Sequence, residues 1–207
     1  MAQIKNQNYR QFLDKGMIKI LEVDHLEKAL SNITGKHKRQ ARALLIALYF
    51  TGARPNEVLK LKAEDIFKER SYIIVNIEGS KRGLPRPIYL QSKNKFIKEF
   101  WLYVKSLHPS MFLFWKFKSQ YIRKVKGKEY IETTDKLRFH FKKWFENVLP
   151  ESIPPYYLRH NRFSKLMLKE ASLDELRLLK GCKDLRSVSA YQHFNVKLSK
   201  KLAKKID

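Results

Sequence analysis

Four residues of this chain belong to the types that can break and rejoin a phosphodiester bond. Arg54 and Arg159 carry planar guanidinium groups, whose paired N–H donors match the oxygens of a phosphate. A tyrosine such as Tyr191 can act as a nucleophile once its hydroxyl loses the proton, and a lysine such as Lys81 can protonate a departing oxygen. If the tertiary structure brings these side chains together, the chemistry they predict is phosphoryl transfer.

The composition favours a nucleic acid as the partner. The 207 residues include 44 Lys and Arg against 20 Asp and Glu, so the net charge is +24 and attracts polyanions. The longest apolar run, residues 43–50, is far too short to cross a bilayer, and the first residues lack the apolar region of a secretory signal. Together with the single cysteine, these features predict a cytoplasmic, DNA-associated protein that has no membrane partner.

Local patterns predict several helices. Apolar residues recur at helical spacing over residues 36–51, Gly52 ends this helix, and Pro55 suits the first turn of the next one. Arg54 therefore lies on a tight corner between two helices. A capping box, Ser-Leu-Asp-Glu at residues 172–175, opens another short helix, which Gly181 ends. Further helices are expected over residues 92–106, 134–148, 156–170 and 185–193, and a short buried segment over residues 111–115.

One β-hairpin is also predicted. Residues 72–77 and 88–90 are rich in β-forming side chains, and the turn between them is basic and contains two glycines. Pro85 and Pro87 cannot donate ladder hydrogen bonds, so the second strand should lie at a sheet edge. The expected fold class is mainly α with a small antiparallel sheet, an α+β arrangement.

Three segments resemble, in order, the conserved boxes of the tyrosine recombinases, the phage-type integrase family. They are TGARPNEVLKL at residues 51–61, LRHNRFS at residues 158–164 and GCKDLRSVSAYQH at residues 181–193. Tyr191 follows Gly181 by ten residues, as the nucleophile does in the family. The hairpin SKRGLPRPI at residues 80–88 is similar to the family's catalytic hairpin. The resemblance spans about residues 21–193 and implies the catalytic-domain fold of DNA breaking-rejoining enzymes.

This resemblance implies a role for each chemical residue. Arg54 and Arg159 correspond to the two catalytic arginines that neutralise the charge on the phosphate, and Lys81 to the lysine that protonates the 5′ oxygen. Tyr191 corresponds to the nucleophile, which forms a 3′-phosphotyrosyl intermediate. That intermediate preserves the bond energy, so rejoining needs no nucleotide. Because the sequence also contains no Walker loop, no metal-binding His pair and no Cys cluster, we expect no cofactor and no metal.

The chain departs from the family pattern at two positions. Tyr156 stands where most members have the His of His-x-x-Arg, which is similar to a Tyr-x-x-Arg variant of some archaeal integrases and implies a catalytic tyrosine; a core aromatic explains it equally well. Cys182 stands where a His or Trp often contacts the phosphate, and we interpret it as a small buried filler. Glu57 is expected to cap a helix or hold an arginine, and His160 to support its neighbour Arg159.

Basic residues outside the boxes are expected to contact DNA phosphates, because solvated charge alone does not explain a net charge of +24. Such contacts position the protein without reading the base sequence. The candidates lie in the hairpin, in the basic stretch at residues 116–128 and beside the second box: Arg82, Arg86, Lys118, Arg123, Lys124 and Arg162.

We expect three parts along the chain. Residues 1–19 form an arm or linker, residues 20–194 the catalytic domain, and residues 195–207 a basic amphipathic helix with Leu198, Leu202 and Ile206 on one face. The resemblance implies that this helix is exchanged between protomers and that the protein is a homo-oligomer, a tetramer on double-stranded DNA, even if it is a monomer in solution.

The expected function is site-specific DNA recombination or integration, and two alternatives remain. A type IB topoisomerase or a telomere resolvase shares the same set of arginine, lysine and tyrosine. A DNA-binding protein with an integrase fold and no activity would explain the departures at Tyr156 and Cys182.

Overall fold

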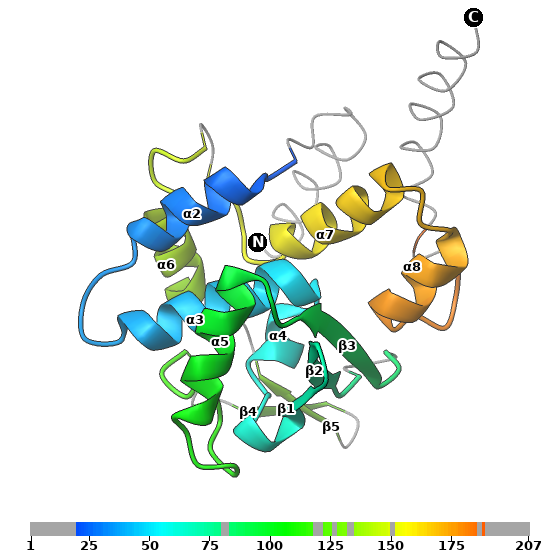
Figure 1. Cartoon of the computed structure of the whole chain (residues 1–207), viewed down its shortest axis with the longest axis horizontal. Coiled ribbons are helices and arrows are strands. Elements are labelled where there is room, and N and C mark those ends of the chain that lie inside the picture. The colour runs from blue at the N-terminus through cyan, green and yellow to red at the C-terminus, as the bar shows by residue number, and fades with distance from the viewer. Residues whose placement is uncertain are drawn as a thin grey trace, which may run out of the picture.

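The computed structural model is mostly helical with a small three-stranded antiparallel sheet, as the sequence predicts, and it also has a two-stranded sheet (Figure 1). It describes residues 20–79, 83–117, 122–125, 128–131, 135–149, 152–185 and 188. Within these residues, no helix is both long enough and apolar enough to span a membrane.

Helix α3 (Lys38–Thr51) lies at the centre of the core. Nearly every side chain of the helix from Gln40 onward is buried, because neighbours cover it on most sides. Helices α5 (Lys95–Lys105) and α7 (Tyr157–Leu168) pack against it, and α2 (Val23–Ser31) and α6 (Asp135–Trp144) complete the surrounding layer (Figure 1). Gly52 ends α3 in the left-handed conformation at φ 61°, which turns the chain sharply toward the site.

The larger sheet covers one side of this helical core. Strands β1 (Ile66–Glu69), β2 (Tyr72–Ile77) and β3 (Arg86–Gln91) pair antiparallel in that order, with Ile73 opposite Leu90 and Val75 opposite Ile88. These four side chains are buried in the core, whereas alternate residues of β3 are exposed. β3 is an edge strand, which accommodates Pro87 as expected. The short helix α4 (Pro55–Val58) and a 3₁₀ turn (Ala63–Asp65) connect α3 to β1.

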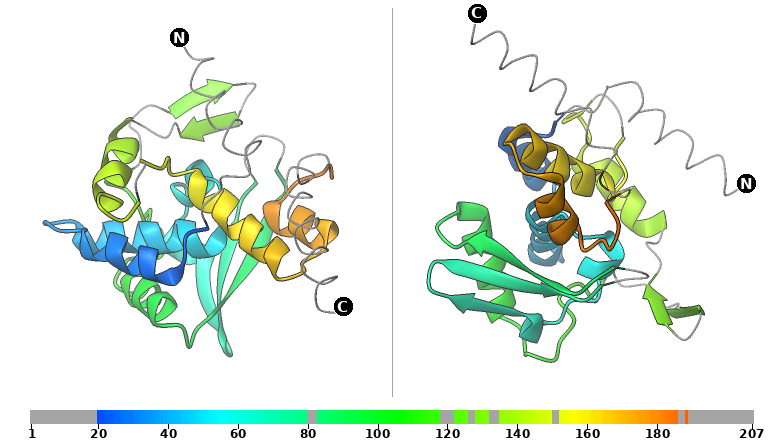
Figure 2. Two further views of the ribbon diagram at one scale, coloured as in Figure 1. Left: turned by 90° about the horizontal axis from the view of Figure 1, so that it is seen from above. Right: turned by 90° about the vertical axis from the view of Figure 1, so that its right-hand side faces the viewer.

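Helix α8 (Leu173–Lys180) folds back beside the start of β3, as both views in Figure 2 show. The predicted capping box opens it: the Ser172 hydroxyl accepts a hydrogen bond from the Glu175 N–H at 3.1 Å, and the Glu175 carboxylate accepts one from the Ser172 N–H at 2.7 Å. Gly181 ends the helix at φ 66°, again as predicted. A second, smaller apolar cluster, made of Phe163, Met167, Leu176 and Val188, joins α8 to α7.

Most predicted elements form within a few residues of the expected bounds, but several features differ, among them strand β1, which the sequence analysis did not predict. The sequence analysis assigned no structure to residues 23–31, although the buried residues of α2, Leu26, Ala29 and Leu30, do follow helical spacing. Part of the basic stretch forms a second hairpin, β4 (Ile122–Val125) with β5 (Lys128–Ile131). In the segment expected to be buried, Leu113 and Phe114 are buried, but Met111 and Trp115 are exposed. The predicted helix at residues 185–193 and the C-terminal helix lie outside the described residues, except for two positions of the former.

Candidate active site

Arg54 lies on the corner between α3 and α4, where the sequence analysis placed it. The carboxylate of Glu57, one turn into α4, caps that short helix by accepting a hydrogen bond from the Arg54 backbone N–H at 2.9 Å. The same carboxylate accepts a bond at 2.8 Å from Nη1 of the Arg54 side chain, which is about one quarter exposed. Glu57 thus both caps a helix and holds an arginine, leaving the guanidinium partly open to a ligand.

Glu57 also binds Arg86, which enters from the start of β3. Nη2 of Arg86 donates to Glu57 at 2.9 Å, while its Nε donates to the Leu179 carbonyl at 2.7 Å. The two arginines and the Arg54 backbone N–H outweigh the effect of burial and lower the pKa of Glu57 to about 2. The carboxylate is therefore ionised at neutral pH, and it joins the α3–α4 corner to the β-sheet.

Arg159 is the largest fully buried side chain of the described residues. Its Nη1 donates to the Gly52 carbonyl at 2.8 Å and its Nη2 to the Lys180 carbonyl at 2.8 Å, while its guanidinium stacks 5.0 Å from the Phe163 ring centre. Its buried Nε has no hydrogen-bond partner in the described part of the chain. Burial, and next the charge of Arg54, lower the pKa of Arg159, so the two predicted arginines act on each other electrostatically.

Tyr156 and His160 lie one turn apart at the start of α7, with ring centres 5.1 Å apart. Tyr156 is 37% exposed, and its hydroxyl interacts electrostatically with both Arg54 and Arg159. It therefore faces the arginines and is not part of the core. Burial, followed by the charges of Lys180 and Arg159, lowers the pKa of His160 to about 3, which keeps its ring neutral at physiological pH.

Cys182 is buried, as expected for a small filler, and its Sγ lies 3.9 Å from the Lys180 carbonyl. Lys180 itself is a residue that the sequence analysis missed. Only 8% of it is exposed, and burial together with Arg159 and Arg54 lowers its pKa to about 8, although the Cys182 thiol acts in the opposite direction. A sequence signal did exist, because Lys180 follows the buried Leu176 by four residues and so shares its face of α8.

Of the six basic residues expected to contact DNA, the structure describes the side chains of two, Arg86 and Arg162. Arg86 is buried, and its Nε, Nη1 and Nη2 all donate to protein groups, which argues against a DNA contact and assigns it a positioning role. Arg162 is half-buried, and burial lowers its pKa; a Cβ on Gly52 would approach its side chain to within 2.8 Å. The remaining four lie outside the described side chains, as do the two other catalytic candidates: Arg82, Lys118, Arg123, Lys124, Lys81 and Tyr191.

The site carries an excess of positive charge. Arg54, Arg86, Arg159 and Lys180 are the cations, and Glu57 is the one carboxylate of the described residues that acts on Arg54 or Arg159. Buried or partly buried cations in such an excess are stabilised by an anion that enters the site. Guanidinium groups favour a phosphate or a carboxylate as that anion. No three His, Cys, Asp or Glu side chains within the described ranges are placed to hold a metal ion.

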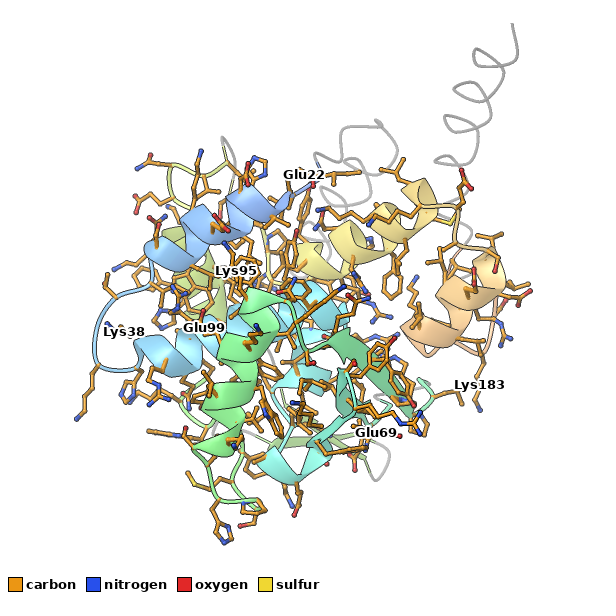
Figure 3. All side chains as sticks on the ribbon, in the orientation of Figure 1. Glu22, Lys38, Glu69, Lys95, Glu99 and Lys183 are labelled. Atoms are coloured by element: carbon orange, nitrogen blue, oxygen red, sulfur yellow. The ribbon has the colours of Figure 1, made fainter. Side chains whose placement is uncertain are left out.

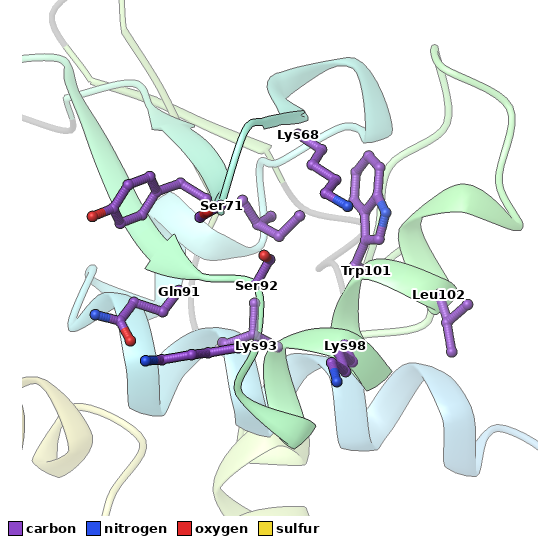
Figure 4. Close-up of a pocket in the computed structure, with 11 residues that line it drawn as sticks. Lys68, Ser71, Gln91, Ser92, Lys93, Lys98, Trp101 and Leu102 are labelled. Carbon is purple, nitrogen blue, oxygen red and sulfur yellow. The ribbon is translucent and has the colours of Figure 1, made fainter.

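An open cleft of about 640 Å³ lies elsewhere, between α5 and the far ends of β2 and β3 (Figure 4). Lys68, Lys93, Lys98 and Trp101 are among the residues that line it, and none of the predicted site residues does. Tyr72, at the start of β2, lines the cleft, whereas Arg86 pairs with Ile77 at the other end of that strand, roughly 17 Å away at the rise of an extended strand. The candidate active site is therefore the cluster of Arg54, Arg86 and Arg159, called the arginine cluster below, and not this cleft.

Comparisons with known proteins identify the family and the fold of this chain. The sequence matches the phage integrase family over residues 19–197, and the chain belongs to that family. No curated protein matches the chain in sequence. The XerH site-specific recombinase, bound to a palindromic difH substrate in a post-cleavage complex, has a similar structure, with a TM-score of 0.64 and 24% identity over 89% of this chain and 53% of XerH.

Two further solved structures share the fold. The XerA recombinase matches with a TM-score of 0.63 and 17% identity over 90% of this chain and 62% of XerA. The Tn1549 transposon integrase in complex with transposon right end DNA matches with a TM-score of 0.57 and 21% identity over 90% of this chain and 66% of that protein. The chain therefore has the fold of tyrosine recombinase catalytic domains, and it spans about half the length of XerH.

Proposed function

We propose that this protein is a site-specific DNA recombinase or integrase, which cleaves and rejoins DNA strands through a 3′-phosphotyrosyl intermediate on Tyr191. The observation that carries the proposal is that Arg54 and Arg159, which are far apart in the sequence, belong to one site in the fold. Arg159 donates to the carbonyl of Gly52, two residues before Arg54, and both side chains belong to one positively charged site. Membership of the phage integrase family supports the same assignment.

In the reaction, the Tyr191 oxygen attacks the scissile phosphorus and the bond from phosphorus to the 5′ oxygen breaks. The tyrosine hydroxyl gives its proton to water, and the departing 5′ oxygen takes a proton from Lys81, which we propose as the donor and which regains a proton from water, so protons balance over the step. The reverse attack by a 5′ hydroxyl releases Tyr191 and reseals the strand, so each step exchanges one phosphoester bond for another. No energy source is needed because the number of phosphoester bonds is unchanged.

Arg54 and Arg159 act on the charge that develops on the non-bridging oxygens during this attack. Arg54 is held by Glu57 while its guanidinium remains partly exposed, and Arg159 is fixed by two backbone carbonyls. Donors fixed in advance stabilise a transition state without the cost of reorganisation, and loss of one typically slows a reaction by about a hundredfold to a thousandfold. Tyr156, close to both arginines, is our candidate for a further hydrogen bond to the phosphate.

We further propose that double-stranded DNA is the substrate and that protomers assemble on it as a tetramer. The division into an arm at residues 1–19, a catalytic domain at residues 20–194 and an exchanged helix at residues 195–207 belongs to the same proposal. The net charge of +24 supports the DNA partner. The assembly, the DNA contact of Arg82 in the hairpin and the cytoplasmic location stay predictions.

A nicked duplex tests the reaction directly. When cleavage occurs close to a nick, the short fragment that carries the new 5′ hydroxyl diffuses away, so it cannot reverse the reaction and the covalent intermediate accumulates. The purified chain is incubated with a labelled pool of nicked duplexes of randomised sequence, and adducts are resolved on a denaturing gel. We expect an adduct with the wild type and with Tyr89→Phe, an exposed tyrosine on the sheet, but none with Tyr191→Phe.

A wild type that forms no adduct over a range of salt and temperature would refute the proposal. An adduct that persists in Tyr191→Phe would refute the assignment of the nucleophile alone.

A further inference from the structure

The turn that ends α8 and carries Lys180 is hydrogen-bonded to three other segments of the chain. The Leu179 carbonyl accepts from Arg86 Nε at 2.7 Å, the Lys180 carbonyl accepts from Arg159 Nη2 at 2.8 Å, and the Gly181 carbonyl accepts from the Leu84 N–H at 2.9 Å. Three consecutive carbonyls at the end of α8 are thus bound by β3, by α7 and by the segment before β3. The backbone that carries the Lys180 side chain is therefore fixed relative to Arg86 and Arg159.

The side chain of Lys180 is buried among charged and titratable groups. The groups that act on it, or on which it acts, are Arg54 from the α3–α4 corner, Arg159 and His160 from α7, and Cys182 just after α8. It follows that the ammonium lies within the arginine cluster, although an extended lysine could reach solvent from most helix ends.

Packing alone does not account for a lysine at this position. Burying an ammonium group is costly, and two neighbouring guanidinium groups add repulsion, whereas an apolar side chain of similar length would fill the space without either cost. A titratable group kept in such surroundings is a candidate for function. Cys182, beside it, offers only a weak hydrogen-bond donor to a ligand.

We propose that Lys180 is a third phosphate-binding cation of the site, which contacts a non-bridging oxygen of the scissile phosphate together with Arg54 and Arg159. Lys180 stands on the fixed end of α8 and so adds a positive charge from a different element than Arg54 or Arg159. With a pKa of about 8, roughly nine-tenths of the side chains are charged at pH 7 even before a phosphate raises that fraction. The proposal rests on the proposed function, because it concerns the same site.

Lys180→Met tests the proposal, because methionine keeps the length of the buried stem and removes the charge. We expect the adduct on a nicked duplex to form about a hundredfold to a thousandfold more slowly, with the melting temperature unchanged or raised. On a duplex whose scissile phosphate is an uncharged methylphosphonate, the loss should shrink to less than tenfold, because no charge remains to be neutralised. Lys180→Arg should restore part of the rate on the ordinary duplex.

Lys38→Met is the matched control. Lys38 is an exposed lysine at the far end of α3, well away from α8 (Figure 3), and its replacement should leave the adduct rate unchanged. A folded Lys180→Met variant that forms the adduct within threefold of the wild-type rate would overturn the proposal. An equal decrease in adduct rate on the ordinary and the methylphosphonate duplex would also overturn it. So would a decrease that disappears only when the leaving group is a 5′ thiol, because Lys180 would then be a proton donor.

A binding measurement keeps the test independent of catalysis. In the Tyr191→Phe background, the affinity for duplex DNA is measured at several salt concentrations. Lys180→Met should reduce the slope of log affinity against log salt by about 0.9, the value for one phosphate contact, and Lys38→Met should not. An unchanged slope would overturn the proposal, whether or not the wild type forms an adduct. Failure of the proposed function and failure of this inference are therefore separable.

Discussion

Glu57→Gln should destabilise the fold in a way that depends on pH. The Glu57 side chain is fully buried and binds Arg54 at 2.8 Å and Arg86 at 2.9 Å. An amide of the same shape carries no charge and presents its own N–H donors to one of these arginines. The variant therefore leaves two guanidinium groups without their shared carboxylate.

The pKa of Glu57 fixes the expected magnitude. It falls from an ordinary value of 4.5 to about 2, a change of about 2.5 units, and at 1.36 kcal/mol per unit the ionised form gains roughly 3 kcal/mol of stability at pH 7. Because the folded-state pKa is the lower one, this stability is present above pH 4.5 and is lost as the pH falls toward 2. The difference in free energy of unfolding between the wild type and the variant should thus fall by roughly half between pH 5 and pH 3.

Urea denaturation followed by tryptophan fluorescence measures this gap at each pH. Glu64→Gln is the control, because Glu64 forms an exposed pair with Lys62 at 3.1 Å and should contribute less than about 1 kcal/mol. A gap below about 1 kcal/mol at pH 7, or one that does not change between pH 5 and pH 3, would refute the role assigned to Glu57.

Three further predictions concern the same site. The pKa of His160 is lowered from 6.5 to about 3, so below pH 6.5 its ring takes up a proton mainly in the unfolded state. The free energy of unfolding of the wild type should therefore fall by about 2 kcal/mol more than that of His160→Gln between pH 7 and pH 5. Equal decreases for the two proteins in urea denaturation would contradict this. Gly181→Ala should lower the free energy of unfolding by more than about 1 kcal/mol, because φ is 66° and the new Cβ would lie 2.8 Å from a backbone oxygen. Gly35→Ala, at φ 88° with nothing within 4 Å, should cost less, and the reverse order would disprove the steric argument. Tyr156→Phe should slow adduct formation by about tenfold to a hundredfold with little change in stability, whereas a core aromatic would show no rate change.

Local signals in the sequence determined most of the elements and the positions of the two arginines. Gly52 and Pro55 fix the corner that carries Arg54, because a left-handed glycine and an N-terminal proline act within a few residues of chain. The capping box at Ser172 and the glycine at 181 likewise define α8 without help from the rest of the molecule. The order of the three boxes also indicated the family, to which the chain belongs.

The surroundings of Arg86 and Lys180 were decided only by the tertiary structure. In the sequence Arg86 is one of several basic residues near a hairpin, yet in the fold it binds Glu57, which is 29 residues away, and turns inward. Lys180 looks like an ordinary cation at a helix C-terminus until α7 and the α3–α4 corner pack around it. Burial and ion pairing depend on contacts between segments that are distant in the sequence. A local sequence pattern contains no information about those contacts. For this reason the sequence could identify the candidate arginines but could not distinguish the cation that positions the site from the one that we propose binds phosphate.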